Sequence, residues 1–291
     1  MYKIALINKF LHAVSVLVLG VAISATATAG DLSYKDAWEK FSNGNFVEAE
    51  AIVDAKLSTD IESMLLKANY LYLKANIQSK RAERYQEALY SYETALQLYT
   101  ISDNDYGIYV SNLGMARIFI REGRTGEAEA ALNVNIQTGE ANNYPLTYPY
   151  YLLARLAFAR GEYEQAMNLS YLSLKHLKTE NPRDKADALL TYGFYQMLNG
   201  YLESGYELTL KGQVALVESG DHNKHYYSLI NMALYRRSQG LEADGLLQMI
   251  DRRAVKDGDD DLLELVRFVQ GFDCAQLSLM ESEPPPAPPP T

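Results

Sequence analysis

The sequence predicts an all-α protein, a right-handed superhelical solenoid of six helical hairpins followed by a closing helix. Three observations lead to this prediction. A short turn motif recurs at a regular spacing, apolar residues between the turns follow a helical period, and no long stretch alternates polar and apolar residues as strands do. A regular period of this kind is typical of arrays in which each helical pair packs on its neighbours.

The repeated motif reads turn residue, aromatic or polar residue, acid or amide, then alanine. Its copies begin at positions 44, 83, 123, 161, 200 and 240, so the successive differences are 39, 40, 38, 39 and 40. Four copies are clear, as in Gly161-Glu162-Tyr163-Glu164-Gln165-Ala166, and in two weaker ones Gly205 and Gly245 replace the alanine. A period kept over six copies predicts six hairpins of similar structure.

A second column of small residues stands seven places before each turn. Its members are Ala37, Asn76, Ala116, Ala154, Gly193 and Ala233. We expect each to face the small residue of the second helix, so that the two backbones approach closely. Within the second helix of repeat two, apolar steps of 4, 3, 4 and 3 mark one helical face, formed by Tyr85, Leu89, Tyr92, Leu96 and Tyr99.

In these small-residue positions and turns the sequence resembles the tetratricopeptide repeat family, over roughly residues 33 to 255. The resemblance implies stacked helical hairpins that bind a protein or a peptide. The repeats here are longer than the period of 34 that is usual in that family, which is similar to the extended repeats of bacterial sensor and regulator proteins. The lysine and asparagine set with which chaperone-binding members hold a carboxylate is not reproduced, so that specific function is not implied.

Residues 1–29 have the features of a secretory signal peptide. A basic stretch with Lys3 and Lys9 precedes an apolar run from position 10 to position 23, and small residues end in Ala27-Thr28-Ala29. This is an A-x-A cleavage pattern, and the apolar run is shorter than the roughly 20 residues that span a bilayer. We expect cleavage before Gly30, no transmembrane segment and a location in the periplasm, with secretion from the cell as an alternative.

Residues 30–280 form the predicted repeat domain, which ends in the closing helix. The acidic run Asp257-Gly258-Asp259-Asp260-Asp261 precedes the apolar stretch 262–269, and we interpret the acids as an N-cap cluster for that helix. A calcium loop is the alternative, but its glycine is at the second place instead of the sixth, and Phe268 stands where a bidentate glutamate belongs. The proline-rich composition of residues 281–291 predicts a disordered tail, and the alternative is a peptide that docks on a partner.

Composition and motifs exclude several functions. Removing Lys3 and Lys9 with the leader changes the net charge from −10 to −12, which disfavours nucleic acid and anionic lipid as partners. Cys274 is the single cysteine, so it has no intramolecular disulfide partner.

The sequence has no nucleophile elbow, phosphate loop, dinucleotide-binding or zinc-protease motif. His222 and His225 have no convincing third ligand. We therefore predict no enzyme activity, no cofactor and no metal site.

The predicted binding site lies on the first helices of repeats three and four, because the first helices of stacked pairs line a concave surface. Six places before the turns stand Trp38, Ile77, Arg117, Arg155, Phe194 and Leu234. Arg117 and Arg155 are therefore predicted neighbours. Arg121 extends the basic strip by one helical turn, and Tyr148 and Tyr151 project from the same inner face. Clustered arginines in an acidic chain indicate capture of an acidic side chain or a C-terminal carboxylate. The alternative is that they only pair with glutamates of adjacent helices.

These observations predict a non-catalytic scaffold or adaptor of the bacterial cell envelope, which binds a protein or a peptide through the concave groove of repeats three to five. Two other classes of function stay open. One is a periplasmic sensor that closes around a small molecule or a signal peptide. The other is an envelope enzyme subunit whose repeats position a cryptic site, which the missing catalytic motifs disfavour.

Overall fold

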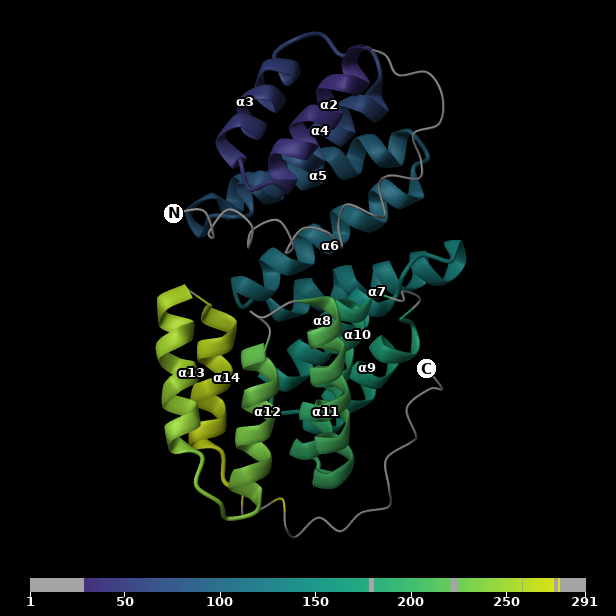
Figure 1. Cartoon of the computed structure of the whole chain (residues 1–291). Helices are drawn as coiled ribbons and strands as arrows, with labels where there is room; N and C mark the ends of the chain where they lie inside the picture. The colour runs from purple at the N-terminus through teal and green to yellow at the C-terminus, as the bar shows by residue number, and fades with distance from the viewer. Residues whose placement is uncertain (1–28, 178–180, 221–224, 258, 275–276, 278–291) are drawn as a thin grey trace. The chain divides into compact units, whose positions relative to one another are not determined.

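The computed structural model describes residues 29–177, 181–220, 225–257, 259–274 and 277, and this part of the chain is built of α-helices without a β-strand (Figure 1). The helices are α2 (Ala29–Ser42), α3 (Phe46–Leu57), α4 (Met64–Gln78), α5 (Tyr85–Ile101), α6 (Asp105–Arg121), α7 (Thr125–Asn142), α8 (Thr147–Ala159), α9 (Tyr163–Lys175), α10 (Pro182–Leu198), α11 (Leu202–Ser219), α12 (His225–Ser238), α13 (Asp244–Asp257) and α14 (Asp260–Gly271). Consecutive pairs from α2–α3 to α12–α13 form six hairpins, and α14 follows them. The predicted all-α repeat fold is confirmed, and the handedness of the superhelix stays a prediction.

Glycines with a left-handed backbone end the first helix of five hairpins. Their φ angles are 80° at Gly44, 70° at Gly123, 75° at Gly161, 86° at Gly200 and 69° at Gly240. Glycine adopts this conformation without the steric cost that a Cβ atom brings, so it is the usual residue just after a helix. The first residue of the repeated motif is therefore a helix stop, as the sequence predicts.

The second hairpin turns without such a glycine. Its first helix, α4, ends at Gln78, and α5 begins at Tyr85 after a corner formed by residues 79–84. Within this corner Ala82–Arg84 form a single 3-10 turn. This longer corner places additional side chains, among them Lys80, beside the ends of the two helices.

Small residues do bring the two helices of a hairpin together. In the first, third and fourth hairpins both positions are fully buried alanines: Ala37 and Ala49, Ala116 and Ala128, Ala154 and Ala166. In the fifth hairpin a Cβ atom on Gly193 would lie 2.6 Å from the carbonyl oxygen of Gly205, and one on Gly205 would lie 2.5 Å from that of Gly193. The backbones of α10 and α11 thus approach more closely than any side chain allows.

The sixth hairpin corrects the predicted register. The sequence alignment puts Gly245 at the small buried place, but nothing lies within 4 Å of the point where its Cβ would be. The second helix, α13, begins at Asp244, four residues after Gly240, whereas in the fifth hairpin the second helix begins two residues after the glycine. Ala243 is buried instead. The longer turn rotates α13, so Gly245 no longer faces the partner helix.

The helix α14 begins as predicted at the acidic run. Asp259 is its N-cap residue, and one carboxylate oxygen accepts a hydrogen bond from the backbone N–H of Leu262 at 3.0 Å. Leu262, Val266 and Val269 are buried on one face of α14, because their spacing of four and then three positions matches the helical period. The interpretation of Asp259 as part of an N-cap cluster is confirmed.

The chain divides between Tyr144 and Pro145 into two compact units, and each is described by itself. In the first unit, Phe41 of α2 and Val53 of α3 pack with Tyr70 and Leu73 of α4. Tyr92 of α5 is also fully buried, and its hydroxyl donates a hydrogen bond to Oδ1 of Asn76 at 3.1 Å. A tyrosine with a buried ring and a satisfied hydroxyl accords with the packing expected of these residues.

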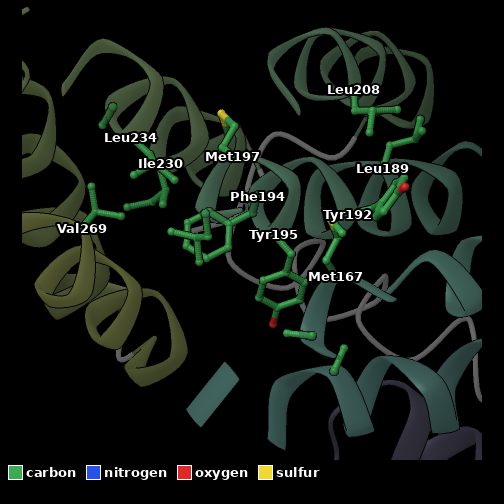
Figure 2. Packing of buried hydrophobic residues seen from close by; sticks show 14 of the residues in the cluster. Met167, Leu189, Tyr192, Phe194, Tyr195, Met197, Leu208, Ile230, Leu234 and Val269 are labelled. Carbon is green, nitrogen blue, oxygen red and sulfur yellow. The ribbon is translucent and has the colours of Figure 1, made fainter. Parts of the chain in front are cut away.

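The core of the second unit surrounds α10, which α9, α11 and α12 contact. Figure 2 shows its side chains, namely Met167 of α9, Leu189, Tyr192, Phe194, Tyr195 and Met197 of α10, Leu208 of α11, Ile230 and Leu234 of α12 and Val269 of α14. Apolar residues lie on every side of α10, which is the pattern of a helix covered all round. This core fixes α8, the helix that carries Tyr148, Tyr151 and Arg155 of the predicted site.

Several sequence predictions fall outside the described residues. They are the leader at residues 1–28, the first member of the His222–His225 pair and the proline-rich tail at 281–291. Cys274 is described and half-buried. Within the described ranges, no helix has the length and apolar character needed to cross a membrane.

Candidate functional site

The predicted column of inner-wall residues is not uniform. Ile77, Phe194 and Leu234 are buried in their units, whereas Arg117 and Arg155 are half-buried. Ile77 packs with residues of α2 and α3, the preceding hairpin, and Phe194 lies against Phe158 and Phe268. Arg117 and Arg155, together with the half-buried Trp38 of the first repeat, therefore have surface that a partner can contact.

In the first unit, Arg117 and Arg121 lie one helical turn apart on α6. The Nη1 atom of Arg121 donates to the hydroxyl of Tyr85 at 3.1 Å and approaches the carbonyl oxygen of Ser79 at 3.5 Å. The guanidinium thus reaches the corner between α4 and α5. Residues four apart share a helix face, so Arg117 points to the same side of α6.

Lys80 belongs to this basic group, although no repeat position singles it out in the sequence. Its Nζ atom lies 5.3 Å from the centroid of the Phe41 ring and 6.0 Å from that of Phe46. Burial lowers the pKa of the Lys80 ammonium to about 7, and the charges of Arg117 and Arg121 act in the same direction. Ring faces attract a cation, which offsets part of the cost of holding it there.

In the second unit, Tyr148, Tyr151 and Arg155 lie together on α8. The two tyrosine rings stack with centroids 5.9 Å apart, and Tyr148 is 41% exposed. Burial raises the pKa of the Tyr151 phenol to about 12, while the positive charge of Arg155 acts to lower it. A stacked pair of rings, one of them exposed, beside a cation offers both apolar contact and hydrogen-bonding groups.

Arg155 already has an acidic partner. Its Nη2 atom lies 2.7 Å from Oδ1 of Asp261 on α14, and Nη1 lies 3.3 Å from Oδ2, so the pair is bidentate. The side chains of Arg155 and Asp261 are 30% and 55% exposed, and an ion pair that solvent reaches in this way contributes about 1 kcal/mol. Arg155 is thus paired within the chain, as the alternative interpretation expects, but with an aspartate of α14 instead of a glutamate of an adjacent helix. A competing carboxylate can replace Asp261 at small cost.

The five predicted site residues therefore form two groups. Arg117 and Arg121 belong to the first unit, and Tyr148, Tyr151 and Arg155 belong to the second. The structure brings the members of each group together. That Arg117 and Arg155 are neighbours stays a prediction. Among the described residues, no group of three or more histidine, cysteine, aspartate or glutamate side chains is arranged to hold a metal ion.

No protein-family model matches the sequence, and no curated protein matches it either. Solved structures do match. The chain is similar in fold to the Rap conjugation gene regulator of the plasmid pLS20, whose structure was determined in complex with the Phr* peptide. The TM-score is 0.58 at 15% sequence identity, and the match covers 86% of this chain and 75% of that chain. This likeness supports the all-α repeat fold beyond the pattern of turns.

The likeness to the Rap regulator concerns the fold only. The assignment of the site residues therefore rests on the structure of this chain. Lys80 and Asp261 are the two residues that sequence reasoning missed. The signal for Lys80 was the second copy of the motif, where Glu83 replaces the turn glycine. A missing glycine indicates a longer corner, and a longer corner can carry a side chain that the other repeats lack.

Proposed function

We propose that this chain is a non-catalytic scaffold of the tetratricopeptide kind that binds a peptide or a segment of a protein. The observation that carries the proposal is the fold, a series of helical hairpins that is similar over 86% of the chain to a regulator whose structure includes a peptide. The exposed polar side chains of α6 and α8 support it, because they combine cations with aromatic rings. Arg117, Arg121, Tyr148, Tyr151 and Arg155 are the proposed contact residues.

A display selection on the purified chain tests this proposal. Peptides recovered from a random library are synthesised, and their dissociation constants are measured by fluorescence anisotropy. We expect Arg117→Gln or Arg155→Gln to weaken binding about tenfold, since a charge-assisted hydrogen bond contributes about 1.5 kcal/mol or more. Lys211→Gln is the matched control, because Lys211 is an exposed cation on the second helix of the fifth hairpin.

Two outcomes of that selection would count against the proposal. If no sequence family of peptides is enriched over an empty support, the binding function itself is wrong. If peptides bind but both arginine variants keep the wild-type affinity, the binding function stands and the site assignment is wrong. Circular dichroism of each variant shows whether a loss of binding reflects a loss of fold.

We also propose that the chain works in the cell envelope after export, on the basis of the leader at residues 1–29. Cleavage before Gly30 removes only Ala29 from α2, so it leaves the first hairpin whole. Expressed in a Gram-negative bacterium, the protein should appear in the periplasmic fraction with the N-terminal sequence Gly-Asp-Leu-Ser. A cytoplasmic protein that retains residue 1 would rule out export.

A further inference from the structure

We propose that Lys80, Arg117 and Arg121 form a seat for a carboxylate group of the bound peptide, within the first unit. The inference rests on the proposed peptide-binding function and deepens it. It assigns the carboxylate that the clustered arginines predict to the first unit, and it adds Lys80 from the corner between α4 and α5. Three features support the proposal. Cations from two elements lie close together, four nearby carboxylates are paired with other cations, and the Lys80 amine is surrounded by cations and aromatic rings.

The cations at this corner come from two elements of the fold. Lys80 belongs to the corner itself, and Arg117 and Arg121 belong to α6. Arg121 lies at the end of α6 and contacts the carbonyl oxygen of Ser79, the residue directly before Lys80, at 3.5 Å. The same guanidinium atom is 3.1 Å from the Tyr85 hydroxyl, where α5 begins. Arg117 lies one turn earlier on the same face of α6. Planar guanidinium groups and an ammonium suit the oxygens of a carboxylate.

Four carboxylates of the surrounding helices are engaged by other cations. The ion pairs are Lys40–Glu48 at 2.6 Å, Arg84–Glu50 at 2.7 Å, Arg84–Glu87 at 2.8 Å and Arg124–Glu122 at 3.0 Å. Among the described residues, neither Lys80 nor Arg121 has a carboxylate partner. In a chain of net charge −10, these two side chains carry positive charge that an anion from outside can neutralise.

The Lys80 amine has cations and aromatic rings around it. The charged groups that act on it are Arg117 and Arg121 of α6, and α2 and α3 present the Phe41 and Phe46 rings. Burial and the two like charges therefore hold its pKa at about 7. A carboxylate bound here favours the ammonium form, because an opposite charge stabilises it, and so raises the pKa of Lys80.

This coupling gives a sign to the pH dependence of binding. Below the pKa of about 7 the free protein already carries the ammonium, and the carboxylate meets three cations. Above that pKa the amine is neutral until the ligand binds, so binding must take up a proton and weakens as the pH rises. Each unit by which the ligand raises the pKa corresponds to about a tenfold difference in affinity between the two pH ranges.

The test follows Lys80 directly by NMR of the full chain with ¹³C-methylated lysines, with Lys80→Arg used to assign the signal. Three probes are added in turn: acetyl-Gly-Ser-Gly-Glu-amide, acetyl-Gly-Ser-Gly-Gly with a free C-terminus, and acetyl-Gly-Ser-Gly-Gly-amide. We expect at least one carboxylate probe to raise the pKa of Lys80 by about one unit, and the amide without a carboxylate to leave it unchanged. The probe that acts tells whether the seat takes an acidic side chain or a chain end.

Substitutions at Lys80 show whether the carboxylate binds at this seat or at another place on the protein. Lys80→Met keeps an apolar stem over the phenyl rings and should weaken carboxylate binding about tenfold and abolish its pH dependence. Lys80→Arg should keep the affinity and lose the pH dependence, because arginine stays charged. Arg252→Gln, an exposed position on α13, is the control and should change neither.

If the pKa of Lys80 responds to no carboxylate probe, or if Lys80→Met binds like the wild type, the seat is wrong. The peptides selected by display then keep their affinity for the wild type, and the proposed function survives. If the display selection fails while Lys80 still responds to a carboxylate, the seat stands and peptide binding does not. The two failures are thus distinguishable.

Discussion

Replacing Gly205 by alanine should lower the free energy of unfolding by about 1 to 3 kcal/mol, the usual cost of overpacking a tight contact. The added Cβ would lie 2.5 Å from the carbonyl oxygen of Gly193 and 2.6 Å from Cγ of Met197. The first of these is a backbone atom of α10, so the helices themselves must separate to relieve the clash. Urea unfolding followed by circular dichroism measures the effect.

Gly245→Ala is the matched control for Gly205→Ala. The two glycines occupy the same place in the sequence alignment of repeats five and six, but nothing lies within 4 Å of a Cβ on Gly245. Because alanine is the better helix former, this variant should be stabilised by up to about 1 kcal/mol. Equal effects of the two substitutions would show that α10 and α11 do not approach as closely as described.

The periodic features of this fold were predictable because each imposes a steric constraint that only a few residue types can meet. A left-handed turn favours glycine, and a close helix contact requires alanine or glycine, so Gly44, Gly123 and their equivalents mark five of the six hairpins in the sequence. The same reasoning placed the N-cap of α14, where Asp259 accepts a backbone hydrogen bond. These constraints are local, and a repeated local constraint is visible without a structure.

The register of the sixth hairpin was not predictable by the same means. Gly240 has the expected left-handed φ of 69°, so the position of the turn was correct. The start of α13 depends on how many residues the turn uses, and this number is set by packing of Ala243 against the core. Aligning Gly245 with Gly205 assumed turns of equal length, which is why that assignment was wrong.

The candidate site was only partly visible in the sequence for a related reason. Spacing within α6 and α8 identifies residues on one helix face, such as Arg117 and Arg121. It gives no information on contacts between elements far apart in the chain. The pairing of Arg155 with Asp261 joins residues 106 positions apart, and Lys80 meets the rings of Phe41 and Phe46 across a corner that departs from the repeat.

Replacing Phe268 by alanine should have the largest effect on stability, about 3 kcal/mol, the lower end of the range for truncating a packed phenylalanine. The ring lies 4.8 Å from that of Phe158, 5.1 Å from Phe272 and 6.0 Å from Tyr163 between centroids, so it joins α14 to α8 and to the start of α9. Edge-to-face contacts of this kind add to the apolar burial. Urea unfolding measures the loss.

The closing helix should respond first, because Phe268 is the residue that attaches it to α8 and to the start of α9. We expect Phe268→Ala to speed amide hydrogen exchange in α14 more than in α10, whose side chains are buried on all sides. Arg267→Ala is the control, since Arg267 is exposed beside Phe268 and such positions change stability by less than about 0.5 kcal/mol. Uniform exchange throughout the second unit would instead mean that α14 and α10 unfold together, and that α14 is part of the core and not a cover for it.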